Sequence, residues 1–219
     1  MKKIIYLVIG VLLNVANLYA QDINTLDNRT IIGVYTIKNQ KDTMKVWIDN
    51  KRTNKKIYFE YLGMCTINTL EFLARTSIGA KKSKISELIS TLTYIRDKAK
   101  EWNSILDSRK IDTYNKEFKE ADFPRLDMFV CVYNQTYPFY DNRHYITKAF
   151  FAKDKDHDNY KILLHVCGVQ TIDRNNEMTM HVNNYIELNE EDINKLIMLL
   201  LDAGKLCEET TDVESLLTD

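Results

Sequence analysis

Residues 163–172, with the sequence LLHVCGVQTI, contain the side chains of this chain that best resemble catalytic groups. His165 stands two residues before Cys167, and His181 follows in the next alternating segment. A thiol beside an imidazole base is the arrangement that a cysteine-dependent enzyme needs, because the base generates the thiolate nucleophile. Cys167 can equally be half of a disulfide or a small apolar residue in a sheet, since cysteine is among the most commonly buried residue types.

The spacing of His165 and Cys167 argues against a direct pair. On a strand, Leu163, His165, Cys167 and Val169 share one face, which places neighbouring side chains of this set about 6.5–7 Å apart. That separation is too long for an assured hydrogen bond, so His165 is a weak candidate for the base.

His181 is the second candidate base, and its position depends on the register of the hairpin. A two-residue turn at residues 175–176 places His181 opposite Gln170, on the other face of the sheet from Cys167. A three-residue loop places it opposite Val169, diagonal to Cys167, because a slip of one residue exchanges the faces. Asparagine tolerates the positive φ of a two-residue turn, which favours the first register. We therefore favour a structural role for Cys167.

The four cysteines allow a disulfide if the chain is exported, because disulfides persist in oxidising compartments. In a meander, the strands of Cys131 and Cys167 are separated by a third strand. The two residues then lie about 9.6 Å apart, beyond the roughly 7 Å Cα limit of a bridge. Cys65 and Cys207 lie just outside the expected regular elements and are the disulfide candidates.

An aromatic segment at residues 133–145, YNQTYPFYDNRHY, is the preferred contact surface. Aromatic side chains on a loop supply a large contact area with a polar handle, which suits stacking on a sugar or gripping a protein partner. The alternative is that the segment folds back onto the sheet as a satellite core. The candidate binding residues are Tyr137, Phe139, Tyr140, His144 and Tyr145.

The segment DKDHDN, residues 154–159, resembles the start of a calcium-binding EF-hand loop. The match fails at two positions, because Asn159 stands where the turn needs glycine and His165 stands where a bidentate glutamate belongs. Sequence motifs for phosphate loops, zinc hydrolases and serine hydrolases are also missing. We expect neither a metal nor a cofactor.

The first twenty residues have the layout of a secretory signal peptide, with Lys2 and Lys3 before an apolar run and Ala20 before a polar residue. We expect cleavage after Ala20, and retention as an anchor is the alternative. No other segment approaches the length that spans a membrane. The expected location is therefore the periplasm or the exterior, with no membrane span after cleavage.

Composition indicates one globular domain that does not bind nucleic acid. The formal charge of the whole chain is −1, whereas nucleic-acid binding needs a concentrated basic surface. Residues 21–207 fit a single domain by the usual 100–200 residues per domain. Residues 208–219 carry acidic residues and no base, so we expect a frayed tail there.

Alternating apolar residues in the first half predict three antiparallel strands, at residues 30–38, 43–49 and 56–62. A 3.6-residue period then predicts an amphipathic helix over residues 85–106, with Ser83 as its N-cap. A short helix over residues 68–76 is a further option.

Four more alternating runs, at residues 125–134, 144–154, 159–173 and 177–188, predict a meander. The segment after them predicts a helix with Asn189 as N-cap and acidic residues in its first turn. Leu188 and Ile193 suit a hydrophobic staple, and Gly204 supplies a left-handed stop.

Strands, helix, strands and helix in this order predict an α+β domain with a mainly antiparallel sheet and its helices on one face. The order is similar to that of helix-grip domains of the START type, which implies a ligand cavity between a curved sheet and the last helix. This similarity concerns element order alone. The preferred function is an exported module that binds a protein or glycan partner through residues 133–145. The alternatives are a carrier of an apolar small molecule and a cysteine-dependent enzyme that uses Cys167.

Overall fold

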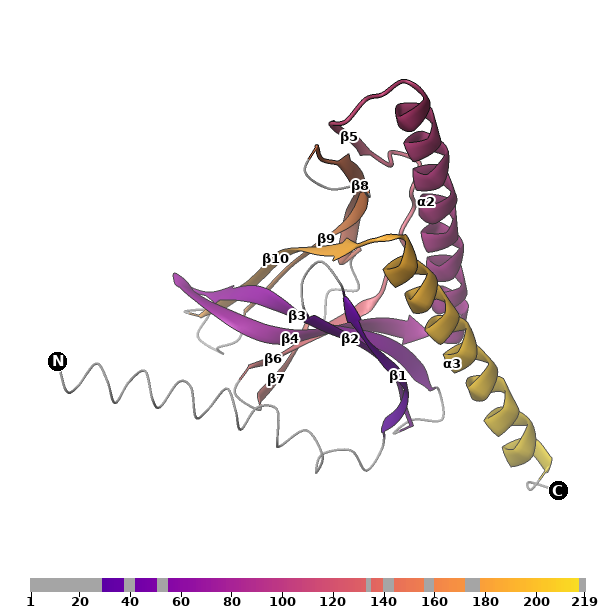
Figure 1. The fold of residues 1–219 in the computed structure, drawn as a ribbon. Coiled ribbons are helices and arrows are strands. Elements are labelled where there is room, and N and C mark those ends of the chain that lie inside the picture. The colour runs from indigo at the N-terminus through magenta and orange to yellow at the C-terminus, as the bar shows by residue number, and fades with distance from the viewer. Residues whose placement is uncertain are drawn as a thin grey trace.

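The computed structural model describes residues 29–37, 42–50, 55–132, 135–139, 144–155, 160–171 and 178–216. Its elements are shown in Figure 1 and follow in chain order. They are β1 (Arg29–Ile37), β2 (Asp42–Asp49), β3 (Lys56–Ile67), β4 (Leu70–Lys81), α2 (Lys82–Ser108), β5 (Tyr114–Glu117), β6 (Asp127–Val132), β7 (Gln135–Phe139), β8 (Ile146–Lys153), β9 (Lys161–Thr171), β10 (Thr179–Leu188) and α3 (Glu190–Leu216).

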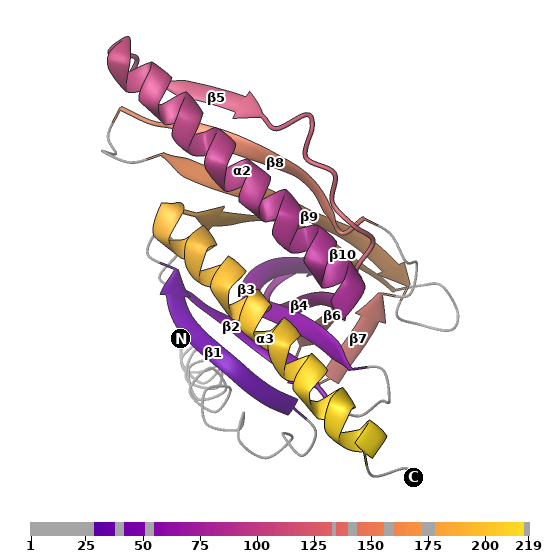
Figure 2. The same cartoon turned by 90° about the vertical axis from the view of Figure 1, so that its right-hand side faces the viewer.

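One ten-stranded sheet contains all of these strands, in the order β5-β8-β9-β10-β3-β4-β6-β7, with β2 pairing to β3 and β1 to β2. The pairings are antiparallel, and α2 and α3 lie side by side over the same face of the sheet (Figure 2). We call this covered face the inner face and the opposite one the outer face. The predicted fold class, an α+β domain with a mainly antiparallel sheet, is confirmed.

Four strands precede α2, one more than predicted. Residues 70–81 form β4, so the option of a short helix over residues 68–76 is wrong. Asn68, with φ 55°, occupies a two-residue turn that brings Leu70 opposite Ile67. The strand assignment rests on pairing, because every residue from Leu70 to Lys81 has an antiparallel partner on β3.

The predicted four-strand meander is correct only for β8, β9 and β10. The strand β6 pairs instead with β4 and β7. The reason is that β4, which the sequence analysis missed, offers β6 a free edge on the other side of the sheet. The strand β7 lies within the segment that we expected to be a loop.

Both predicted helices are present, but not all of their predicted ends are correct. The α2 residues Ile85, Leu88, Leu92, Ile95, Ala99 and Leu106 are buried. This helix begins at Lys82 after Lys81, so the prediction of Ser83 as N-cap is wrong. At α3 the predicted cap is confirmed, because the Asp192 N–H donates to Asn189 Oδ1 (2.8 Å) and the Asn189 N–H donates to Asp192 Oδ2 (3.2 Å).

Gly204 does not end α3, as the sequence had suggested. The helix continues to Leu216, and a Cβ built on Gly204 would meet no atom within 4 Å. The glycine therefore sits in an ordinary helical turn with open space around it. The frayed tail over residues 208–219 stays a prediction, with its first nine residues in helical backbone.

The strand β3 is the place where the sheet forks. Along one edge, its residues 56–60 pair with β2 and its residues 65–67 pair with β10. Between these two partners, the Leu62 N–H donates to Asp42 Oδ2 (2.7 Å) and the Met64 N–H donates to Asn184 Oδ1 (2.9 Å). Two side-chain oxygens thus take the place of a neighbouring strand at the fork.

Gly63 gives Asn184 the space to reach this position. A Cβ at residue 63 would lie 2.6 Å from Asn184 Nδ2 and 2.9 Å from Cε2 of Tyr61. Asn184 and Tyr61 are both buried on the inner face, so neither can move into solvent to relieve the contact. Glycine is therefore required at this position by close approach.

Among the described residues, no helix combines the length and the apolar character that crossing a membrane requires. The predicted signal peptide, residues 1–20, lies outside the described residues.

Two glycine substitutions should have opposite effects on stability. Gly63→Ala should lower the free energy of unfolding by about 1–3 kcal/mol, because the added methyl group overpacks the fork. Gly204→Ala should raise it by about 0.5–1 kcal/mol, because alanine is the better helix former and finds open space. Urea unfolding of both variants measures these changes. A Gly63→Ala protein as stable as the wild type would contradict the packing described at the fork.

Candidate functional site

The register of β9 and β10 determines which side chains meet on the outer face. Tyr185 pairs with His165, Asn183 with Cys167, and His181 with Val169. This is the register that we associated with a three-residue loop, so the favoured two-residue turn is wrong. The turn itself, residues 172–177, lies outside the described residues. As a result, His165, Cys167, Asn183 and Tyr185 lie together on the outer face.

His165 is held between the two neighbouring strands. Its Nε2 atom lies 2.7 Å from Asn183 Oδ1 on β10, and its Nδ1 atom lies 2.6 Å from Thr147 Oγ1 on β8. An amide oxygen can only accept, so Nε2 carries a proton, and in the neutral imidazole the Nδ1 lone pair then accepts from the Thr147 hydroxyl. The three side chains therefore form a hydroxyl–imidazole–amide relay, which we call the His165 relay.

A β-bulge aims Thr147 at the imidazole. Ile146 pairs with Val166 and Lys148 pairs with His165, so Thr147 is the extra residue on β8. Bulges are frequent beside functional sites because the extra residue redirects a side chain out of the regular ladder. Thr147 is exposed to solvent in this position.

Tyr185 presents an aromatic ring on the outer face next to the relay. Its ring centroid lies 4.9 Å from that of His165 and 6.3 Å from that of Phe150, and the residue is 49% exposed. The two contacts fix the ring while leaving much of it accessible. A rigid, half-exposed aromatic ring offers contact area at little cost in conformational entropy.

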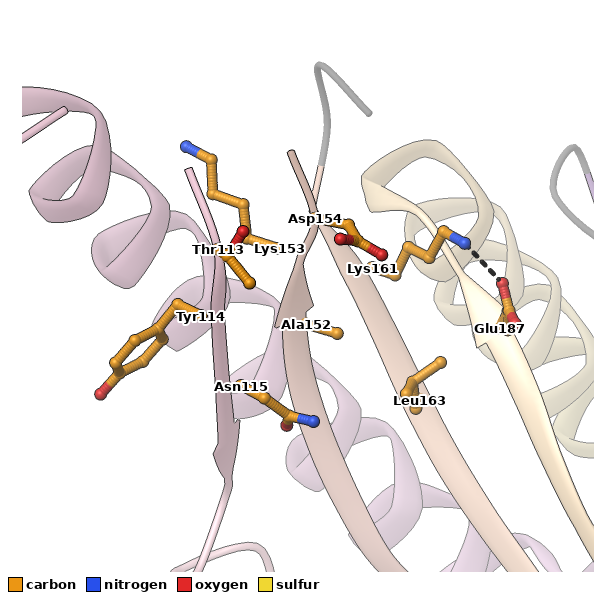
Figure 3. Close-up of a pocket in the computed structure, with 9 residues that line it drawn as sticks. All are labelled: Thr113, Tyr114, Asn115, Ala152, Lys153, Asp154, Lys161, Leu163 and Glu187. Atoms are coloured by element: carbon orange, nitrogen blue, oxygen red, sulfur yellow. Dashed lines mark ion pairs between the residues drawn. The ribbon is translucent and has the colours of Figure 1, made fainter. Parts of the chain in front are cut away.

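A shallow pocket of about 290 Å³ lies on the same side of the sheet (Figure 3). Ala152 and Leu163 form its apolar floor, and the ion pair between Lys161 and Glu187, 3.1 Å long, lies along one side. The other lining residues are Thr113, Tyr114, Asn115, Lys153 and Asp154. Leu163 is two residues from His165 on β9, so the pocket and the relay are about 6.5–7 Å apart along one strand.

His165 is not placed to act as the base that Cys167 would need in a cysteine-dependent enzyme. Both ring nitrogens of His165 are hydrogen-bonded to other side chains, Thr147 and Asn183. His181 lies on the same face as Cys167 but directly opposite Val169. The geometry therefore gives no support to Cys167 as a nucleophile.

The structure does not join the two disulfide candidates, Cys65 and Cys207. None of the four cysteines forms a disulfide bond in the structure. Glu208, next to Cys207, forms an ion pair with Lys82, which follows the end of β4 that pairs with Lys56. Cys65 lies nine residues farther along β3, and at about 3.3 Å per residue the two thiols are on the order of 30 Å apart.

Two aromatic side chains of the segment at residues 133–145 lie in the core. Phe139 and Tyr145 are buried, their rings meet edge to face at 6.1 Å, and the Tyr145 hydroxyl donates to the Phe139 carbonyl (2.8 Å). The alternative of a satellite core therefore describes these two residues, and neither offers a surface to a partner.

The other candidates in this segment differ from one another. Tyr137 is half-buried and donates to Gln135 Oε1 (2.5 Å). His144 is exposed, with its Nδ1 2.5 Å from the Phe123 carbonyl oxygen. Tyr140 lies outside the described residues.

The sequence analysis missed Thr147, Asn183 and Tyr185. Asn183 and Tyr185 could have been found, because the correct hairpin register places them directly beside His165. Thr147 could not, because a bulge has no reliable sequence signal.

No group of three histidine, cysteine, aspartate or glutamate side chains within the described part of the chain could hold a metal ion. Comparison with models of protein families gives no match, and comparisons with curated proteins and with solved structures also give none. The similarity in element order to helix-grip domains therefore gains no support from solved structures.

Alkylation should separate the four thiols into two classes. Burial raises the pKa of the Cys65 and Cys207 thiols, so at mildly alkaline pH less of each is the reactive thiolate. Cys131 and Cys167 are half-buried and should react first with iodoacetamide in the native protein. Mass spectrometry after timed alkylation measures the order. Protein from an oxidising compartment should accept four alkyl groups after denaturation without reductant, and a lower number would show that a disulfide has formed.

Proposed function

We propose that the protein is an exported binding module that holds a saccharide on the outer face of β8, β9 and β10. The proposed location, periplasmic or secreted, rests on the signal-like residues 1–20. The proposed contact surface replaces the aromatic segment at residues 133–145, whose Phe139 and Tyr145 are core residues.

Tyr185 carries the proposal. Sugars present apolar C–H faces and a rim of hydroxyl groups, so they suit an aromatic ring beside hydrogen-bonding side chains. The Tyr185 ring is fixed by His165 and Phe150, and Asn183 lies on the same face of β10. Because the ring is already ordered in the folded protein, a ligand that stacks on it causes little further loss of conformational entropy.

The pocket beside Tyr185 would serve as a second contact. Glu187 accepts hydrogen bonds and Lys161 donates them, while Asn115 can do both. Leu163 and Ala152 give the pocket an apolar floor (Figure 3). A mixture of charged, amide and apolar groups in a shallow depression suits a polar, uncharged ligand better than an apolar one.

A protein partner is the second candidate, favoured by apolar residues farther along the outer face. Met64 pairs with Leu73 on the β3–β4 hairpin, and Leu73 is 66% exposed. Val169 on β9 is 46% exposed. Exposed apolar residues that gather on one face mark interaction surfaces more often than isolated ones do.

The proposed carrier of an apolar small molecule has less support. The described pocket lies on the outer face, whereas the carrier needs a cavity between sheet and helices. Side chains of α3 such as Ile193 and Leu196 are fully buried on the inner face.

Saccharide binding should depend on Tyr185. The full-length protein is screened against an oligosaccharide array, and the best binder is measured by titration calorimetry. Tyr185→Ala should weaken its affinity about tenfold, corresponding to the roughly 1.4 kcal/mol of a good aromatic contact. Tyr94→Ala is the control, because Tyr94 lies on α2.

Two results would contradict the saccharide proposal: an array without binding, or an unchanged affinity in Tyr185→Ala. Leu73→Asp distinguishes a protein partner from a saccharide. This substitution should abolish association with a protein partner and leave the affinity for the saccharide unchanged.

A further inference from the structure

The His165 relay has the geometry of an activated hydroxyl nucleophile. The Thr147 hydroxyl lies 2.6 Å from His165 Nδ1 and 3.5 Å from the His165 carbonyl oxygen, so the imidazole is its main acceptor. Asn183 fixes the ring from the opposite side through Nε2. Nucleophile, base and orienting group therefore follow one another in hydrogen-bond contact, as covalent acyl-transfer catalysis requires.

We propose that Thr147 is a nucleophile for acyl transfer and that the protein hydrolyses small carboxylic esters. His165 is the general base and Asn183 is a positioning residue. The inference does not depend on saccharide binding, because it rests on the three relay residues and not on Tyr185.

The reaction balances without a further reagent. The Thr147 Oγ1 atom forms a bond to the ester carbonyl carbon while its proton passes to His165 Nδ1. The bond from this carbon to the leaving oxygen then breaks, and the leaving alkoxide takes the proton from Nδ1. Water next gives a proton to Nδ1 and attacks the acyl carbon. Thr147 leaves with that proton, and a carboxylic acid is released.

The surroundings of the relay determine the substrate class. Thr147 is exposed on its bulge, so an ester can approach it from solvent. Leu163 and Phe150 lie on the outer face next to His165 and offer an apolar surface to a short acyl group. Lys148, the cross-strand partner of His165, has an exposed ammonium group 3.6 Å from Glu117 Oε1, and it is the cation that we assign to the carbonyl oxygen that becomes negative.

A fluorophosphonate with a short alkyl chain tests the nucleophile directly. Its phosphorus bonds to an activated hydroxyl oxygen with loss of fluoride, and mass spectrometry of peptides locates the adduct. We expect an adduct on Thr147 in the full-length wild-type protein. Thr147→Val should abolish it, and His165→Gln should slow labelling by about 100-fold or more, the usual contribution of a general base.

Matched variants separate chemistry from folding. Thr147→Ser keeps a hydroxyl group and should keep labelling, and so should Thr136→Val, which removes an exposed threonine from β7. Asn183→Ala should slow labelling about tenfold or more, whereas Asn183→Asp keeps an acceptor for Nε2 and should restore it. Circular dichroism of each variant checks that the sheet is intact.

Hydrolysis of p-nitrophenyl acetate gives an independent readout through the released nitrophenolate. Wild-type activity that is lost in Thr147→Val and retained in Thr147→Ser supports the proposal. An adduct elsewhere, no adduct, or labelling of Thr147 that is equally fast in His165→Gln would overturn it. Saccharide affinity should be unchanged in Thr147→Val, so failure of the esterase proposal is distinguishable from failure of the binding proposal.

Discussion

Two side-chain oxygens hold the fork in the sheet on which the outer face depends. Asp42 and Asn184 accept the Leu62 and Met64 N–H groups where β3 passes from one neighbouring strand to the other. A buried N–H group without an acceptor costs about 1–3 kcal/mol, and these two N–H groups are partly buried, so both oxygens stabilise the fork. Because β10 pairs with β3 just beyond this point, the fork also sets the position of β9 and β8. Gly63 is the third component, since a larger residue would displace Asn184.

As a result, the two faces of β8, β9 and β10 have different roles: the inner face forms the core, and the outer face carries the candidate site. Alternate residues such as Leu164 and Ile186 pack under the helices and are fully buried. The residues between them face away from the helices, where His165 and Tyr185 meet polar neighbours from the adjacent strands. The rigid inner face thereby fixes the spacing of groups on the outer face without covering them. This is the physical basis for both proposals, because ligand stacking and nucleophilic attack each require side chains that are ordered before the ligand arrives.

Much of the fold follows from periodicity, and most of the site does not. The stripe of α2 and the reciprocal cap of Asn189 and Asp192 were predictable because they depend on residues three or four positions apart. The strand β4 was missed because its alternation is weak, with Ala74 and Gly79 among its buried positions. Register was predicted wrongly because one residue more or less in the loop before β10 decides it. Thr147 was missed because a bulge depends on the partner strand and not on local sequence. The separation of Cys65 and Cys207 could not be foreseen, because the sequence alone gave no distance between them.

The His165 relay depends most directly on one orientation of the imidazole, with its Nδ1 lone pair toward Thr147 and its Nε2–H toward Asn183. Nitrogen-15 NMR of the imidazole rings in alkaline buffer measures this orientation. We predict a single neutral tautomer for His165, protonated at Nε2, whose Nδ1 resonance shifts when Thr147 is replaced by valine. A ring protonated at Nδ1, or an average of both tautomers that does not respond to the Thr147 substitution, would contradict the relay.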